Sequence, residues 1–155
     1  VERISLGDVD APIYDGDFEA GSGLPDGIVR LRETIAGSDG LLVGCPEYNG
    51  YMTPLLLNAL NWSTRSDAAA PDLTPFRNKL VVISSTSPGP LGGMRATREL
   101  RNFLTGIGAL VLPQAYSIPR AMGAFDEEGK LKDERAAKQS QTIAAQLVDM
   151  AGRLA

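Results

Sequence analysis

The sequence predicts an α/β protein with three layers, in which helices cover both faces of a parallel sheet. Three short, continuous apolar runs lie at residues 41–45, 80–84 and 109–112, and such runs are typical of strands buried on both faces of a parallel sheet. Segments with apolar side chains at helical spacing separate these runs. This alternation of strands and helices predicts a single α/β domain over residues 1–155.

The N-terminal part is expected to contain a strand, a loop and a helix. Residues 1–6 alternate well enough to form a strand, and an acidic loop is expected from Gly7 to about Leu24. A helix is expected to begin at Pro25, because proline suits the first helical turn. Three apolar residues share one face of this helix: Ile28, Leu31 and Ile35.

The next helix has a clear start signal at Thr53-Pro54, a capping hydroxyl followed by proline at the first helical position. It is expected to run to about Thr64. Its predicted inward residues are Leu55, Leu56, Ala59, Leu60 and Trp62. Trp62 is expected in the core or at an interface, with ligand stacking as the alternative.

Two further helices are expected in the second half. One begins near Arg95, and its apolar face carries Leu100, Phe103, Leu104 and Ile107. The strand at 109–112 is expected to resume at 115–118. A long closing helix over 133–154 is expected to turn inward Ile143, Ala144, Leu147, Val148, Ala151 and Leu154.

Composition excludes several classes of function. The net charge is −4 without a run of basic residues, which argues against a nucleic-acid binder. No apolar stretch approaches the roughly 20 residues that span a bilayer, so no membrane association and a cytoplasmic location are expected. The acidic loop at 7–24 lacks the EF-hand spacing, so we expect it to be solvated rather than to bind calcium.

The same counts exclude several kinds of catalytic site. The chain has no histidine, which excludes Ser-His-Asp and Cys-His sites and the usual zinc sites. A single cysteine, Cys45, provides neither a disulfide nor a thiolate metal cluster, so no metal site is expected. An enzyme of this composition is therefore expected to use a bound cofactor.

Two loops are placed to bind a ligand. In open α/β sheets, ligands bind beyond the carboxyl ends of the strands, and residues 46–52 and 85–94 each follow a predicted strand and lead into a helix. Their backbone N–H groups and the helix N-termini are expected to face an electron-rich ligand. The second loop matches neither the dinucleotide fingerprint nor the P-loop, and its bare backbone suits a flat ligand. Tight βα turns without a ligand are the alternative.

The two loops carry motifs about 40 residues apart. The motifs are Pro46-Glu47-Tyr48-Asn49-Gly50, followed by Thr53-Pro54 and Asn58-Ala59-Leu60-Asn61-Trp62, and Ser87-Pro-Gly-Pro-Leu-Gly-Gly-Met-Arg-Ala96. They resemble the signatures of the NAD(P)H-dependent FMN reductase family, which contains flavodoxin-like quinone, azo-dye and chromate reductases. The resemblance covers essentially the whole chain.

The resemblance implies a flavodoxin-like fold with a doubly wound sheet of order 2-1-3-4-5 and FMN at the carboxyl edge. It implies that hydride passes from NADPH or NADH through flavin N5 to a quinone, flavin or similar small-molecule acceptor, without a catalytic side chain. It also implies a homodimer or homotetramer. Helix 53–64 supports assembly, because it carries more apolar positions than one core-facing stripe can bury.

On matching positions, the resemblance places two sets of residues around the isoalloxazine ring. One side is lined by Pro46, Glu47, Tyr48, Asn49 and Gly50, and the other is approached by Ser87, Gly89, Gly92 and Gly93. Amide dipoles of the first loop would stabilise the negative charge that reduced flavin concentrates near N1 and O2. Gly92→Val is accordingly expected to weaken FMN binding and to leave the fold largely intact.

The sequence departs from the family at its start. Family members open with a strand and a Gly-Ser-x-Arg-x-x-Ser loop that binds the FMN phosphate, whereas this sequence begins where the second family strand would begin. We expect the natural protein to carry an upstream strand, phosphate loop and helix. The alternative is a shortened, non-catalytic paralogue. A further alternative to an enzyme is a flavodoxin-like electron carrier that binds FMN without turning over nicotinamide.

Each of six further positions has two interpretations. Cys45 is expected to be a small core residue rather than a redox thiol. Tyr48 either stacks near the flavin or packs under its loop, and Glu47 either holds the loop through hydrogen bonds to backbone or is solvated. Three arginines follow one another at three-residue spacing: Arg95, Arg98 and Arg101. They either form a solvated helix face or attract the 2′-phosphate of NADPH.

Overall fold

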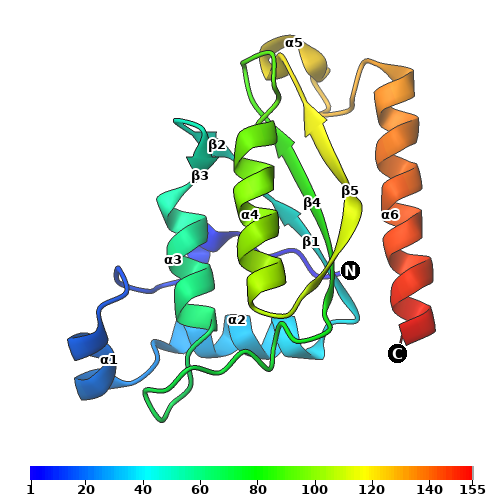
Figure 1. Cartoon of the computed structure of the whole chain (residues 1–155). Helices are drawn as coiled ribbons and strands as arrows, with labels where there is room; N and C mark the ends of the chain where they lie inside the picture. Colours follow the sequence, from blue (N-terminus) through cyan, green and yellow to red (C-terminus); the bar gives the residue numbers. More distant parts are fainter. Residues whose placement is uncertain (155) are drawn as a thin grey trace. The chain divides into compact units, whose positions relative to one another are not determined.

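Three apolar segments form a parallel sheet in the computed structural model, which describes residues 1–154. The strands are β1 (Gly40–Gly44), β4 (Leu80–Thr86) and β5 (Leu110–Ile118), in the order β1-β4-β5 (Figure 1). Gly40 pairs with Leu80, and Leu80 pairs with Leu110. The prediction of a parallel sheet built from these apolar runs is confirmed. The expectation of burial on both faces is confirmed for β4 but wrong for β1 and β5, where Leu42 is 57% exposed and Leu110 is 45% exposed. The two predicted parts of the last strand form one strand with an irregular register opposite residues 81–83.

The chain divides into two compact units. One contains Val1–Ser38 and Pro54–Arg77, and the other, which we call the sheet unit, contains Asp39–Thr53 and Asn78–Ala155. Each is described by itself below. The prediction of one domain over residues 1–155 stays a prediction.

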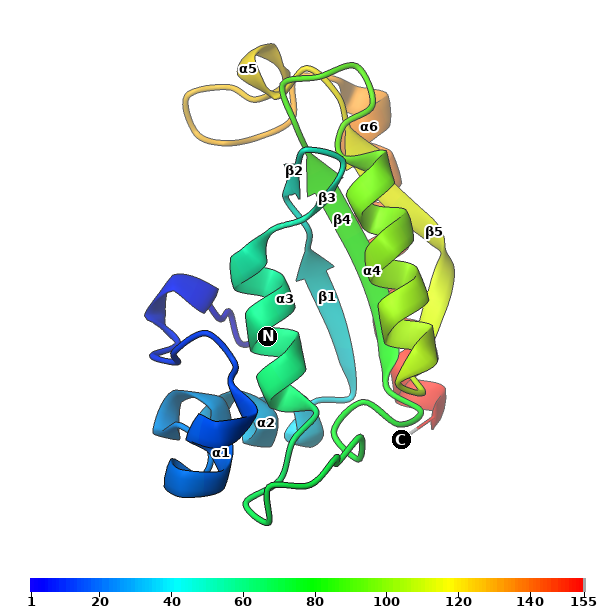
Figure 2. The same cartoon turned by 60° about the vertical axis from the view of Figure 1, so that its left-hand side comes forward.

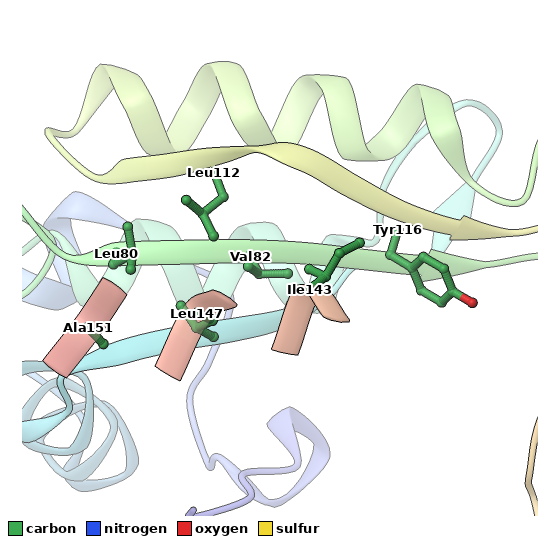
Figure 3. Packing of buried hydrophobic residues seen from close by; sticks show 7 residues of the cluster. All are labelled: Leu80, Val82, Leu112, Tyr116, Ile143, Leu147 and Ala151. Carbon is green, nitrogen blue, oxygen red and sulfur yellow. The ribbon is translucent and has the colours of Figure 1, made fainter. Parts of the chain in front are cut away.

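Helices cover both faces of the sheet in the sheet unit. α4 (Met94–Gly106) lies on one face and α6 (Glu134–Leu154) on the other, so this unit has three layers (Figure 3). The side chains of one buried cluster join α6 to the sheet: Leu80, Val82, Leu112, Tyr116, Ile143, Leu147 and Ala151. Because side chains alternate along a strand, Val81 and Ile83 point to the opposite face, where both are completely buried.

The other unit is helical. It contains a 3-10 turn at Leu6–Asp8 and the helices α1 (Gly16–Ser22), α2 (Asp26–Gly37) and α3 (Pro54–Ser63) (Figure 2). α2 packs against α3. The predicted apolar face of α2 is confirmed, because Ile28, Leu31 and Ile35 are all buried. Residues 121–124 of the sheet unit form one further short helix, α5 (Ala121–Ala124).

Two expectations for the N-terminal segment are wrong. Residues 1–5 form no strand, because within residues 1–154 their backbone pairs with no neighbouring strand, and a strand needs such a partner. The predicted acidic loop contains α1, whose first N–H groups, from Asp17 and Phe18, are capped by the Asp15 side chain. Glu19 is not solvated: it is 3% exposed and forms a bidentate ion pair with Arg65.

Several predicted inward positions also differ. Leu55 is 50% exposed, while Trp62 is fully buried and donates its indole N–H to the Pro12 carbonyl at 2.8 Å. Val148 and Leu154 of α6 are 69% and 62% exposed. A long helix on a three-stranded sheet buries a narrower stripe than the sequence pattern predicts, so the flanking apolar positions face outward. No helix among residues 1–154 is long and apolar enough to cross a membrane.

Candidate functional site

The two loops that the sequence predicts to bind a ligand lie at the same edge of the sheet. β1 and β4 are parallel neighbours whose last paired residues are Gly44 and Ser84, so the segments that follow them leave the sheet side by side. The first site loop (residues 45–53) and the second site loop (residues 87–93) both belong to the sheet unit. The structure therefore brings together the two stretches that the motifs single out, at the carboxyl ends of the strands.

The first site loop is a small hairpin rather than an irregular loop. β2 (Glu47–Tyr48) pairs antiparallel with β3 (Tyr51–Met52), and the two residues between them have positive φ, 54° at Asn49 and 83° at Gly50. This is the backbone of a tight hairpin turn for which Asn-Gly is the preferred pair. The Asn-Gly pair between two short strands is the signal that sequence reasoning missed.

Glu47 ties this hairpin to the start of α4. Its Oε2 accepts hydrogen bonds from the backbone N–H groups of Arg95 (3.1 Å) and Ala96 (3.2 Å), and its Oε1 accepts from Arg95 Nε (3.2 Å) and Nη2 (2.9 Å). The expectation that Glu47 holds the loop through backbone hydrogen bonds is confirmed. The hairpin accordingly contacts the first turn of α4 (Figure 2).

The carboxylate of Glu47 is held in its charged form. Its side chain is 8% exposed. Burial alone raises the pKa of Glu47, but the hydrogen bonds from the Ala96 backbone and from Arg95 outweigh burial, so the pKa of Glu47 lies below its ordinary value. Glu47 also occupies the N-terminus of α4, so the expectation that this N-terminus faces a ligand is wrong for the Arg95 and Ala96 N–H groups.

A second contact connects β4 with the start of the first site loop. Ser85, buried near the end of β4, donates its hydroxyl to the carbonyl of Cys45 at 2.6 Å. Cys45 itself is 1% exposed, and burial, together with the charge of Glu47, raises the pKa of its thiol to about 11. The thiol therefore stays protonated near neutral pH, as expected for a small core residue and not for a redox thiol.

Two glycines of the second site loop are needed by the protein's own packing. A Cβ built on Gly92, which has φ +60°, would lie 2.6 Å from the carbonyl carbon of Ile118 and 2.7 Å from the nitrogen of Pro119. A Cβ on Gly93, with φ +87°, would lie 1.8 Å from Ser85 Oγ. The expectation that Gly92→Val leaves the fold largely intact is therefore wrong, because the branched side chain meets backbone of the same protein.

The segment after β5 forms one wall of the second site loop, which sequence reasoning missed. The Ser87 N–H donates to the Ile118 carbonyl, the Arg120 N–H donates to the Gly89 carbonyl, and the Ala121 N–H donates to the Ser87 carbonyl. Arg120 has φ 54°, an uncommon conformation for a residue other than glycine. Gly89 has an ordinary backbone, and a Cβ there would meet only Ser87 Oγ, at 3.7 Å.

Large apolar side chains are exposed around the two site loops. Their exposed fractions are 63% for Tyr48, 47% for Tyr51, 43% for Leu91 and 47% for Met94. Tyr48 and Tyr51 are paired across the hairpin, and the Met94 N–H donates to the Leu91 carbonyl. Tyr48 does not pack under its loop. Exposed apolar side chains beside backbone polar groups suit a flat, largely apolar ring with a polar edge, such as the isoalloxazine of FMN.

The arginines near α4 have distinct roles. Arg95 forms the ion pair with Glu47, and Arg101 donates to the carbonyls of Val111 and Pro113, both at 3.3 Å. Neither is a merely solvated residue. Arg98 is exposed. The 2′-phosphate interpretation of this row stays a prediction.

The helical unit contains two open hollows of about 410 and 320 Å³. The larger is lined by Glu2–Ser5, Asp8, Val9 and residues of α2, and the smaller by Leu24, residues of α2 and residues of the segment 66–75. We place the candidate site at the two loops instead, because ligands of open α/β sheets bind beyond the carboxyl ends of the strands and exposed apolar side chains lie there.

Comparisons with known proteins show which family the chain belongs to. The family model described as NADPH-dependent FMN reductase matches residues 1–123. An NAD(P)H-dependent FMN reductase of Pseudomonas aeruginosa is 37% identical over 149 residues, which cover 93% of this chain and 77% of that protein. A quinone reductase of Escherichia coli is 36% identical over 103 residues, which cover 66% of this chain and 52% of that protein.

A solved structure gives the same answer for the fold. The chain matches FerB of Paracoccus denitrificans, described as a flavoenzyme NAD(P)H:(acceptor) oxidoreductase, with a TM-score of 0.77 and 31% identity. The match covers 96% of this chain and 78% of FerB. The flavodoxin-like α/β fold is confirmed, with a parallel sheet of order β1-β4-β5, while the full strand order 2-1-3-4-5 stays a prediction. The chain belongs to the NADPH-dependent FMN reductase family.

Proposed function

We propose that this protein is a flavin-dependent NAD(P)H oxidoreductase that passes hydride from a nicotinamide through bound FMN to a quinone, a flavin or a similar small acceptor. The observation that carries the proposal is the pair of site loops at one sheet edge, with backbone groups and exposed apolar side chains around them. Family membership supports FMN as the cofactor and NADPH or NADH as the co-substrate.

Two sets of residues are proposed to hold the ring. The first set is Pro46, Glu47, Tyr48, Asn49 and Gly50, and the second is Ser87, Gly89, Gly92 and Gly93. Within the first set, the exposed ring of Tyr48 is free to contact an apolar face, while Glu47 acts through the hairpin it holds. Within the second set, Gly92 and Gly93 give the loop its backbone shape, and Gly89 leaves open backbone for a ligand.

The protein's own contribution is binding and orientation. FMN, when bound, supplies the two-electron chemistry of hydride acceptance and donation. Neither Glu47 nor Cys45 is a free base in the resting state, because Glu47 is engaged in four hydrogen bonds and Cys45 is protonated. The loops therefore orient the ring, present one apolar face to the second substrate, and direct amide dipoles at the polar edge.

The test uses the whole natural protein. It is mixed with FMN, NADPH or NADH, and a quinone, and nicotinamide oxidation is followed by absorbance at 340 nm, with FMN-free and protein-free mixtures as controls. We expect FMN-dependent oxidation well above both controls. An electron carrier would bind FMN and show no oxidation above background, and a non-catalytic paralogue would not bind FMN. Either result would contradict the proposal.

We also propose that the protein is a homo-oligomer whose active site lies close to a subunit boundary. Support comes from α3, which carries more apolar positions than its buried stripe uses: Leu56, Leu60 and Trp62 are buried, whereas Leu55 is 50% exposed. Light scattering on the whole natural protein at micromolar concentration tests it, and a monomer would contradict it. A cytoplasmic location stays a prediction from composition.

A further inference from the structure

The two site loops are connected by a carboxylate that belongs to only one of them. Glu47 lies in the first site loop, yet all four hydrogen bonds given above come from Arg95 and Ala96, directly after the second site loop. The contact therefore spans 48 residues of sequence between Glu47 and Arg95.

The start of α4 lacks a cap of its own. Gly93 is the N-cap residue, it has no side chain, and its backbone is left-handed. The first N–H groups of a helix have no partner within that helix, and a side chain usually satisfies some of them. Here Glu47 does so from the neighbouring loop. Without Glu47, the N–H groups of Arg95 and Ala96 would lose this acceptor.

Arg95 extends the same contact over the hairpin turn. A Cβ built on Gly50 would lie 3.5 Å from both Cζ and Nε of Arg95, so the guanidinium lies beside the turn. The ion pair is partly open to water on the arginine side, where the side chain is 62% exposed, and closed on the glutamate side. The hairpin is thus held at Glu47 by hydrogen bonds, with the Arg95 side chain beside its turn.

From these contacts we propose that Glu47 is a positioning residue that holds the two site loops at the spacing which binds FMN. The inference rests on the proposed function. Glu47 acts through the hairpin and α4, not by proton transfer, because its oxygens are already occupied by four donors. A loop that is held in its binding-competent form does not have to be ordered when the ligand arrives. If only a fraction of molecules keeps that form, the apparent Kd rises in inverse proportion to the fraction.

Four variants of the whole natural protein test the proposal. Glu47→Ala removes the acceptor, and Glu47→Gln keeps one carbonyl oxygen for the backbone of α4 but loses the charge. Arg95→Met keeps the backbone N–H groups and removes the guanidinium. Asp149→Asn is the matched control, since it breaks an exposed ion pair with Arg153 within α6.

Two measurements are made on each variant. The first is the Kd for FMN from quenching of flavin fluorescence. The second is hydrogen exchange without FMN, which compares a peptide covering residues 47–52 with one covering β4. Hydrogen exchange without FMN tests the contact between Glu47 and α4 separately from the proposed function.

We expect Glu47→Ala to raise the Kd for FMN roughly tenfold or more. The Kd of Glu47→Gln and of Arg95→Met should lie between that of Glu47→Ala and that of the unmodified protein, and Asp149→Asn should leave the Kd unchanged. We expect faster exchange in residues 47–52 and no change in β4. An unchanged Kd in folded Glu47→Ala would overturn the proposal. So would an equal loss of protection in β4, because that is the result of general destabilisation. Absence of FMN binding by the unmodified protein would instead overturn the proposed function.

Discussion

The two site loops reach a defined shape by different physical means. The first site loop is held by hydrogen bonds and charge, through its hairpin ladder and the Glu47 carboxylate. The second site loop is held by steric contact, because Gly92 and Gly93 lie so close to Ile118, Pro119 and Ser85 that no side chain fits. A glycine-rich loop beside a ligand site is therefore not always bare for the ligand. Here the protein's own backbone and side chains fill the space at two of its glycines.

This difference gives the two loops different sensitivities. The contacts of Gly92 with backbone and of Gly93 with the Cβ of Ser85 cannot be relieved by a side-chain rotation, so substitutions of these two glycines are expected to act mainly on stability. Contacts of a carboxylate depend on its charge, so the first site loop is expected to respond to pH. The following predictions test this comparison, from the largest expected effect to the smallest.

Gly92→Ala is expected to lower the free energy of unfolding by about 3 to 5 kcal/mol, from overpacking against Ile118 and Pro119 together with a strained backbone at φ +60°. Urea unfolding followed by circular dichroism measures the loss. Gly89→Ala, with an ordinary backbone and open space, is the matched control and is expected to stay within about 0.5 kcal/mol of the unmodified protein. Equal stability of the two variants would contradict the steric account of this loop.

Gly93→Ala is expected to lower the free energy of unfolding by about 2 to 4 kcal/mol, because the new methyl group displaces the Ser85 hydroxyl and breaks its buried hydrogen bond to the Cys45 carbonyl. The double variant with Ser85→Ala removes the closest contact. The loss of unfolding free energy in the double variant should therefore be smaller than the sum of the losses in the two single variants. Simple additivity of the two free energies would show that Gly93 and Ser85 are not coupled.

Acid is expected to weaken the first site loop. Because the pKa of Glu47 is lower in the folded than in the unfolded protein, its stabilising contribution is present above the unfolded value of about 4.3 and is lost as the pH falls through the folded pKa. Glu47→Gln should be less stable than the unmodified protein by about 1.5 kcal/mol at pH 7. The difference should shrink as the pH falls below 4. A difference independent of pH between 7 and 3 would contradict this assignment.

Gly50→Ala is expected to have the smallest effect of the four, about 1 kcal/mol, from the strain of φ +83° alone. The neighbouring Arg95 side chain is at ordinary contact distance and is able to move aside. Thermal unfolding measures the change. A loss as large as that of Gly92→Ala would show that the hairpin turn is also held by steric contact.

Part of the molecule follows from local sequence alone. The apolar runs at 80–84 and 109–112 both form strands, and in the first of them Leu80–Ile83 are buried on both faces. The helix α3 begins at Pro54, as the Thr53-Pro54 pair predicts. These features depend on residues that are close together in the sequence. The spacing of apolar side chains along the chain therefore predicts them directly. The Asn49-Gly50 turn belongs to the same class, since its signal is two residues long.

Other features were decided by tertiary contacts. Residues 1–5 alternate like a strand, yet they pair with no strand within residues 1–154, because pairing needs a partner that local pattern does not provide. Glu19 looks like one of several solvated acidic residues, but it is buried because Arg65, 46 residues away, and the Tyr14 hydroxyl donate to its carboxylate.

The site shows the same division. The sequence by itself determined where the two loops lie, since both follow buried parallel strands, and its two motifs indicated the family. Only the tertiary structure decided that Glu47 caps α4 and that Gly92 faces the Ile118–Pro119 backbone. The physical reason is that hydrogen bonds and steric contacts act over a few ångströms in space. Residues that lie 26 or 48 positions apart therefore meet only when the sheet brings their strands together.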